Sequence, residues 1–174
     1  MRKLSATHWT PVAVARKAAE FLVKGVDTKV LDIGSGAGKF CVLAANFTSA
    51  QITGVERREN LVLLSRKLAM RQEVKNVNFV HADIKDIDFK AYDSFYFFNA
   101  FEENINLTDK LDSSDSIDSE QYRHYCQLLH DRFDEARIGT RVVTYCGEGK
   151  EIPDSFTLVR QTNKGKLLFW EKRG

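Results

Sequence analysis

Hydrophobic residues follow two different spacings along this chain, and the two spacings alternate. Short, nearly continuous apolar runs between polar or glycine residues are typical of strands buried in a parallel sheet. Such runs occupy residues 29–34, 51–56, 76–83, 94–101 and 141–146. Apolar residues at every third or fourth position, as in amphipathic helices, occupy 11–24, 40–47, 59–73 and 119–139. The alternation predicts an α/β fold with a doubly wound, mostly parallel sheet.

The helical spacing also predicts which side chains face the core. Thr10 and Pro11 are expected to begin the first helix as its cap and its first residue. The residues expected to point inward are Val12, Ala15, Ala19 and Leu22 in that helix, Leu61, Leu64 and Leu68 in 59–73, and Tyr122, Cys126, Leu129, Phe133 and Ala136 in 119–139. Each helix should therefore cover the sheet with one apolar face.

The C-terminal end departs from this alternation. Residues 155–162 and 165–172 predict two strands joined by a turn around Asn163, Lys164 and Gly165, hence a β-hairpin. Such a hairpin adds one antiparallel strand to the otherwise parallel sheet. A length of 174 residues suits one domain, so we expect residues 1–174 to form a single domain.

Composition narrows the class of protein only slightly. The chain is 43% hydrophobic and 29% charged, and its net charge of +2 gives no general argument for nucleic acid or membrane binding. No apolar run approaches a membrane span of about 20 residues, and the N-terminus lacks a signal-peptide core. Cys41, Cys126 and Cys146 fit neither a disulfide framework nor a zinc site. We therefore expect reduced thiols, a cytoplasmic protein and no metal.

A glycine-rich turn follows the first strand, in the segment VLDIGSGAGKF (30–40). A strand, a glycine turn and a helix direct backbone N–H groups towards a ligand. A dinucleotide fingerprint would need a glycine at position 39, where the chain has Lys39. Asp32 would repel a pyrophosphate but tolerate a positive charge. These features favour S-adenosylmethionine, which carries an ammonium and a sulfonium, over NAD.

Two further acidic residues end the next two strands. Glu56 lies 24 residues after Asp32, where a carboxylate can accept hydrogen bonds from both ribose hydroxyls. Asp83 ends the third strand and can accept from an adenine amino group. Each acid alone could be a solvated carboxylate at a strand end. Because the carboxyl ends of parallel strands share one edge of the sheet, the three acids together predict a nucleoside site there.

These segments resemble the motifs of the class I S-adenosylmethionine-dependent methyltransferases, which have a Rossmann-like fold. The resemblance is carried, in order along the chain, by VLDIGSGAGKF, GVERREN, VHADI and YDSFYFFNAF. It extends over about residues 9–172 and implies a seven-stranded sheet of order 3-2-1-4-5-7-6, with strand 7 antiparallel and helices on both faces. It also implies S-adenosylmethionine as cofactor and methyl transfer as the reaction.

The resemblance assigns roles to individual residues. It implies that the methionine end of the cofactor is lined by Asp32, Gly34, Ser35, Gly36 and Gly38. By the same resemblance, Glu56 holds the ribose, and Asp83 with Ile84 faces the adenine. Arg57 and Arg58 follow the ribose acid and either flank the adenosine or form a solvated helix entry.

The methyl acceptor is expected at the end of the fourth strand, in FFNAFEEN (97–104). Amino methylases have Pro-Pro after the corresponding Asn or Asp, and no proline follows Asn99. A looser likeness is to the histone-lysine methyltransferases with a seven-stranded fold, whose loop interleaves asparagine and phenylalanine. Either likeness implies that Asn99 contacts the cofactor and offers its amide oxygen to an amine, while Phe101 walls the pocket. Alternatively, Asn99 closes a turn and Phe101 belongs to the core.

The segment 102–120 concentrates negative charge. It holds seven acidic residues, four serines and one lysine, and the rest of the chain has 25 basic against 17 acidic residues. We expect a long loop at the rim of the acceptor pocket that favours a cationic acceptor, such as the lysine of a protein, because carboxylates repel a phosphate backbone. RNA or a small molecule remains an alternative acceptor, and a non-catalytic S-adenosylmethionine-binding subunit is an alternative function. The oligomeric state stays open.

Overall fold

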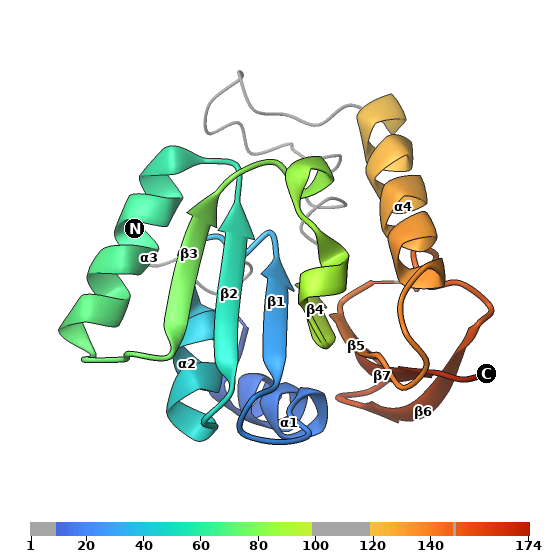
Figure 1. The fold of residues 1–174 in the computed structure, drawn as a ribbon, viewed down its shortest axis with the longest axis horizontal. Coiled ribbons are helices and arrows are strands. Elements are labelled where there is room, and N and C mark those ends of the chain that lie inside the picture. The colour runs from blue at the N-terminus through green and yellow to red at the C-terminus, as the bar shows by residue number, and fades with distance from the viewer. Residues whose placement is uncertain (1–9, 99–118, 148) are drawn as a thin grey trace.

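The computed structural model describes residues 10–98, 119–147 and 149–174. Its strands form a seven-stranded sheet of order β3-β2-β1-β4-β5-β7-β6 (Figure 1). The strands are β1 (Lys29–Ile33), β2 (Gln51–Glu56), β3 (Val77–His81), β4 (Ser94–Phe98), β5 (Arg141–Tyr145), β6 (Phe156–Thr162) and β7 (Leu167–Lys172). β1 to β5 pair in parallel, whereas β7 runs antiparallel to both β5 and β6. The predicted fold class and strand order are confirmed.

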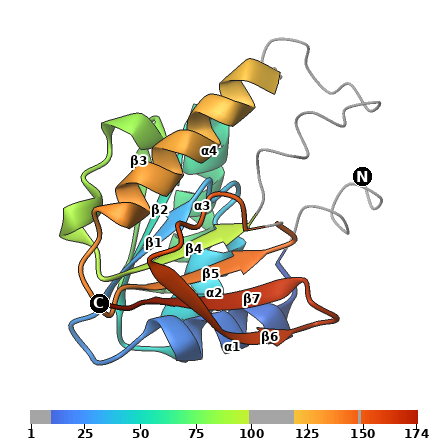
Figure 2. The ribbon, with the colours of Figure 1, turned by 90° about the vertical axis from the view of Figure 1, so that its right-hand side faces the viewer.

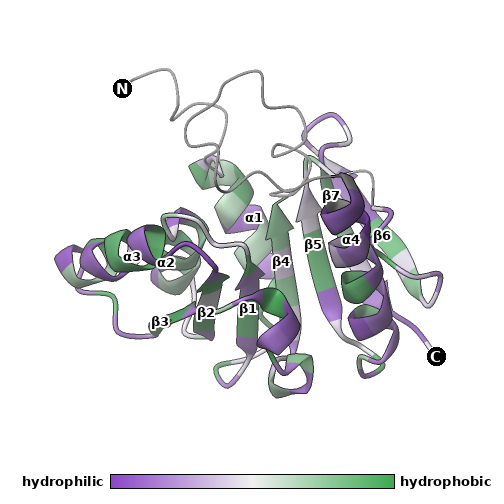
Figure 3. Ribbon diagram, turned by 90° about the horizontal axis from the view of Figure 1, so that it is seen from above, coloured by the Kyte–Doolittle hydropathy of each residue, from purple (hydrophilic) through white to green (hydrophobic). Residues whose placement is uncertain are grey.

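Helices cover both faces of this sheet. Figure 2 shows α4 (Ser119–Asp134) on one face and α1 (Val12–Leu22) on the other. The helices α2 (Lys39–Phe47) and α3 (Glu59–Arg71) contribute to the same core layer as α1. The short 3₁₀ helices η1 (Ile84–Asp86) and η2 (Phe89–Ala91) join the layer beneath α4. The strands therefore lie between two apolar layers, and Figure 3 shows hydrophobic residues gathered on the central strands.

The face of α3 that packs on the protein differs from the expected one. Its buried residues are Val62, Ser65 and Ala69, whereas Leu64 is 50% exposed. The helix approaches the glycine turn closely, since a Cβ added to Gly38 would lie 2.5 Å from the Cβ of Ser65. Only small side chains fit at so close an approach. The prediction was therefore wrong for Leu64, whereas Leu68 is partly buried and packs against the core.

The cap of α1 and the residues that α1 and α4 bury also differ in part from the predicted ones. Thr10 does not cap α1; its hydroxyl lies 3.0 Å from the hydroxyl of Tyr96 in the core. Val12 is 52% exposed, so it is not part of the inward stripe. In α4 the buried residues at helical spacing are Tyr125, Leu129 and Phe133, and the side chain of Tyr122 lies outside the described residues. Tyr125 was not predicted to point inward.

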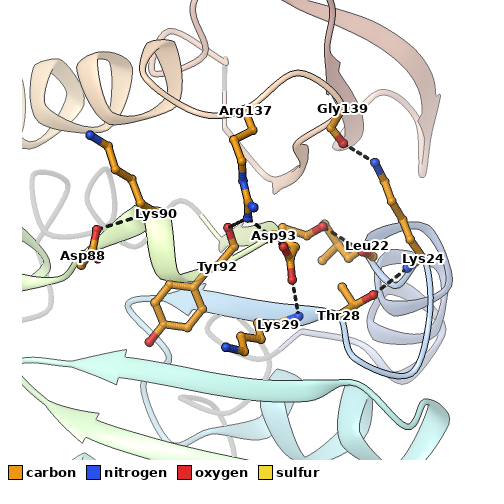
Figure 4. A network of polar contacts seen from close by, with 11 residues as sticks. Leu22, Lys24, Thr28, Lys29, Asp88, Lys90, Tyr92, Asp93, Arg137 and Gly139 are labelled. Atoms are coloured by element: carbon orange, nitrogen blue, oxygen red, sulfur yellow. Dashed lines mark hydrogen bonds and ion pairs between the residues drawn. The ribbon is translucent and has the colours of Figure 1, made fainter.

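Polar contacts link the loops at the amino ends of the sheet's strands (Figure 4). The carboxylate of Asp93, just before β4, accepts from the backbone N–H of Lys29 at 2.9 Å and from the guanidinium of Arg137 at 2.9 Å. The ammonium of Lys24 donates to the carbonyl of Gly139. Surface hollows of about 220 and 660 Å³ lie at this edge, and none of the predicted site residues lines them. These contacts link loops at the amino ends of the strands, whereas the acidic residues of the predicted site lie at the carboxyl ends.

Candidate cofactor-binding and active site

The glycine turn joins β1 to α2 and has two different kinds of glycine. Gly38 adopts φ +77° at the start of α2, and a Cβ there would lie 2.6 Å from the ring of Phe79. Gly36 adopts φ +54°, but a Cβ on it would meet nothing within 4 Å among the described residues. Gly38 is therefore required by packing against the protein. Gly36 instead leaves open space on the outer side of the turn, where a ligand could approach the main chain closely.

Ser35 directly precedes Gly36 and brings a hydroxyl to the turn. Its Oγ is buried and, among the described residues, has no hydrogen-bond partner. The side chain lies over Gly54 of β2, where an added Cβ would be 2.7 Å from that oxygen. A buried hydroxyl without a partner favours a polar ligand group nearby.

Glu56 connects the end of β2 to the glycine turn. The side chain is 5% exposed, and its Oε2 accepts from the backbone N–H of Gly36 at 3.0 Å. Its Oε1 accepts from both the backbone N–H and the Nε of Arg58, each at 3.0 Å, and Nη2 of that arginine lies 3.3 Å from Oε2. A ribose bound at Glu56 would share these oxygens with the guanidinium or displace it. Arg57 turns its backbone carbonyl towards Nε2 of His81, at 3.0 Å.

Asp83 lies at the start of η1, beyond the end of β3. Its Oδ1 accepts from the backbone N–H of Lys85 at 3.0 Å, and its Oδ2 accepts from the hydroxyl of Tyr125 at 2.6 Å. Burial, followed by the hydrogen bond and charge of Asp83, raises the pKa of Tyr125 to about 12. Ile84 is buried in the core layer beneath α4. The spacing of Tyr125, Leu129 and later residues at every fourth position was the signal that could have revealed this tyrosine.

Asp32 points under α2 from the end of β1. It is 2% exposed, and its Oδ2 accepts from the thiol of Cys41 at 3.0 Å. Burial raises the pKa of Asp32 to about 7, and the nearby charge of Glu56 adds to this, while the Cys41 hydrogen bond opposes it. Burial likewise raises the pKa of the Cys41 thiol. A positive charge bound above the turn would favour the ionised form of Asp32.

The acceptor side is described only in part. Phe98 and Tyr145 face each other at the ends of the paired strands β4 and β5, with ring centroids 5.0 Å apart. Asn99, Phe101 and residues 102–118 lie outside the described residues. Within the described ranges, no group of three or more His, Cys, Asp or Glu residues could hold a metal ion. No helix in those ranges has the length and apolar character of a membrane span.

The mostly parallel sheet closed by an antiparallel hairpin has the strand order that the resemblance to class I methyltransferases implied, with a glycine turn after β1. The family model for the methyltransferase domain matches residues 24–126. This chain belongs to that family. The protein is a class I S-adenosylmethionine-dependent methyltransferase.

Solved structures of several methyltransferases share this fold. An RNA methyltransferase from Salinibacter ruber, in complex with S-adenosyl-L-homocysteine, has a TM-score of 0.67 at 21% identity, covering 94% of this chain and 92% of that one. TrmN from Thermus thermophilus has a TM-score of 0.68 at 16% identity, covering 96% and 51%. An rRNA methylase from Streptococcus thermophilus has a TM-score of 0.61 at 14% identity, covering 97% and 100%. No curated protein matches the chain in sequence.

Proposed function

We propose that this methyltransferase transfers a methyl group to an amine of a protein, of the lysine kind. The observation that carries the proposal is the charge of residues 102–120, which hold seven acidic residues and one lysine. This segment follows β4, whose carboxyl end shares an edge with the ends of β1 and β5. Acidic side chains at the acceptor edge attract a cationic partner and repel an anionic one.

The proposed cofactor site uses the residues expected from the sequence. The methionine end would be held by Asp32, Gly34, Ser35, Gly36 and Gly38, the adenosine by Glu56, Arg57, Asp83 and Ile84. Three observations support this proposal: the free space beside Gly36, the buried hydroxyl of Ser35 that has no partner among the described residues, and the hydrogen bond from the Gly36 N–H to Glu56, which places that carboxylate beside the turn. When bound, S-adenosylmethionine supplies an electrophilic methyl group on a sulfonium.

The proposed acceptor site lies beside the end of β4. Asn99 would accept a hydrogen bond from the amine and contact the cofactor, and Phe101 would wall the pocket. The described aromatic pair of Phe98 and Tyr145 lies at the same edge, which supports an apolar, water-poor surrounding there. In-line displacement needs such orientation, because the nucleophile must line up with the bond that breaks.

RNA is the second candidate acceptor. Outside 102–120 the chain has 25 basic against 17 acidic residues, so much of its surface can contact phosphates. Two of the similar structures are described as an RNA methyltransferase and an rRNA methylase. An RNA substrate would bind less tightly as salt rises, because each phosphate contact releases counterions.

Tritiated S-adenosylmethionine incubated with the enzyme and a cell extract tests the proposal. We expect label in macromolecules that protease releases and nuclease does not. Label lost to nuclease would establish RNA as the acceptor, and label only in the low-mass fraction would establish a small molecule. Binding of S-adenosylmethionine with no transfer to any fraction would indicate a non-catalytic subunit.

A further inference from the structure

Two donors from different parts of the chain hold the carboxylate of Asp83. The backbone N–H of Lys85, two residues along, bonds Oδ1 at 3.0 Å. The hydroxyl of Tyr125, which lies on α4 and 42 residues away in sequence, bonds Oδ2 at 2.6 Å. A carboxylate bonded through both oxygens cannot rotate freely about its last side-chain bond. Each oxygen retains a second lone pair that can accept from a ligand.

We infer that Tyr125 is a positioning residue that orients Asp83 towards the adenine and thereby sets selectivity for the 6-amino group. The inference rests on the proposed function, in which Asp83 faces the adenine base. An ionised carboxylate accepts hydrogen bonds and donates none. A carboxylate held in one orientation therefore favours a base with an amino group at that position over a base with a carbonyl oxygen there.

The environment of Tyr125 suits this role. Its ring is buried in the core layer beneath α4, together with Ile84 and Leu129, so packing fixes the position of the hydroxyl. A tyrosine hydroxyl is protonated at physiological pH, and burial with the contact to Asp83 raises the pKa of Tyr125 further, to about 12. The hydroxyl therefore acts as a hydrogen-bond donor to Asp83 throughout the physiological pH range.

The geometry also joins two regions that are separate in sequence. α4 begins at Ser119, within the acidic segment 102–120, and Tyr125 lies less than two turns into the helix. The hydrogen bond to Asp83 therefore links the adenine acid to the helix that follows the proposed acceptor loop.

Calorimetric binding of two ligands to the Tyr125→Phe variant tests the inference. The ligands are S-adenosylhomocysteine and S-inosylhomocysteine, in which a carbonyl replaces the 6-amino group. Because Asp83 is no longer held in the orientation that meets the amino group, its hydrogen bond to the base weakens and we expect S-adenosylhomocysteine to bind about five- to tenfold more weakly. S-inosylhomocysteine should change by less than about twofold, so the selectivity falls. Tyr92→Phe, a tyrosine whose ring packs on Phe95 away from the site, is the matched control and should change neither affinity.

Equal weakening of both ligands, or no change in either, would overturn the inference, because packing alone does not distinguish an amino group from a carbonyl. The Asp83→Ala variant separates this failure from that of the proposed site. If Asp83→Ala abolishes the selectivity and Tyr125→Phe preserves it, only the positioning role is lost. If Asp83→Ala itself leaves the selectivity unchanged, Asp83 does not face the adenine, and both its proposed role in the cofactor site and the positioning role of Tyr125 fail.

Discussion

At the scale of single residues, the burial of Asp32 opposes folding stability at neutral pH. Its carboxyl group is buried against Cys41, and burial raises its pKa from 3.8 to about 7. Between these two values the folded protein binds a proton that the unfolded chain releases. The free energy of unfolding contributed by Asp32 is therefore greatest below pH 4 and falls as pH rises to about 7.

The first prediction is that Asp32→Asn stabilises the protein at high pH only. The amide keeps an acceptor for the Cys41 thiol and removes the buried charge. We expect the free energy of unfolding to rise by about 2–4 kcal/mol at pH 8 and by less than about 1 kcal/mol at pH 4. Urea unfolding at both pH values measures this, with the exposed Asp27→Asn as control. An equal gain at both pH values would contradict a raised pKa.

The second prediction concerns Glu56, whose oxygens contact both the turn and Arg58. We expect Glu56→Ala to weaken S-adenosylhomocysteine binding by about 1.5–3 kcal/mol, because a charged acceptor for two hydroxyls is removed. The sequence alone suggested a carboxylate outside the core, whereas the side chain is buried. A loss of about 1–2 kcal/mol in stability should therefore accompany the loss of affinity.

Calorimetry and thermal unfolding measure the two effects of Glu56→Ala separately. Glu59→Ala, an exposed acid in the first turn of α3, is the matched control and should change the affinity little. Unchanged affinity in the Glu56 variant would place the ribose elsewhere.

At the scale of elements, the close contact of α3 with the glycine turn decides what the turn can contain. A Cβ on Gly38 would meet both Ser65 and the ring of Phe79 at less than 3 Å, and the residue has φ +77°. The turn must therefore lack a side chain at Gly38, where it contacts the protein, as well as at Gly36, where the proposed ligand would lie. This explains why a small residue, Ser65, faces the turn from α3.

The third prediction is that Gly38→Ala destabilises the protein by more than about 3 kcal/mol, because a left-handed backbone and an overpacked contact both add to the cost. Gly165→Ala is the matched control: it has φ +81° in the hairpin turn, and its Cβ would meet nothing within 4 Å. That variant should lose only about 1–2 kcal/mol. Denaturant unfolding compares the two, and equal losses would mean that contact with α3 and β3 is unimportant.

At the scale of the whole molecule, charge is segregated between residues 102–120 and the remainder of the chain. The fourth prediction is that changing Asp109, Asp112, Asp115 and Asp118 to Asn raises the KM for a cationic protein acceptor and leaves cofactor affinity unchanged. The effect should shrink at physiological ionic strength, where a Debye length of about 8 Å screens exposed charges.

Methylation assays at low and physiological salt measure this effect. The control variant changes four exposed acids in other segments, Asp27, Asp88, Asp131 and Asp154, to Asn and should leave the KM unaltered. If both variants behave alike, the acidic segment contributes only general solubility.

The sequence by itself determined the succession of strands and helices, the closing hairpin, the glycine turn and the acids that end β1 and β2 and follow β3. Each of these features can be predicted from the local spacing of residues, because hydrophobic periodicity and turn residues act over a few neighbouring positions. Resemblance to a family, rather than spacing, supplied the order of strands. The roles assigned to Asn99 and Phe101 stay predictions.

Only the tertiary structure decided which residues meet across long distances in the chain. The bond from Tyr125 to Asp83, the contact of Thr10 with Tyr96 and the inward face of α3 could not be read from periodicity. A helical pattern shows that several faces are apolar enough to be buried, but the shape of the opposing surface selects one of them. Here the close approach of α3 to Gly38 requires a small residue, Ser65, at the contact, because a larger side chain does not fit there.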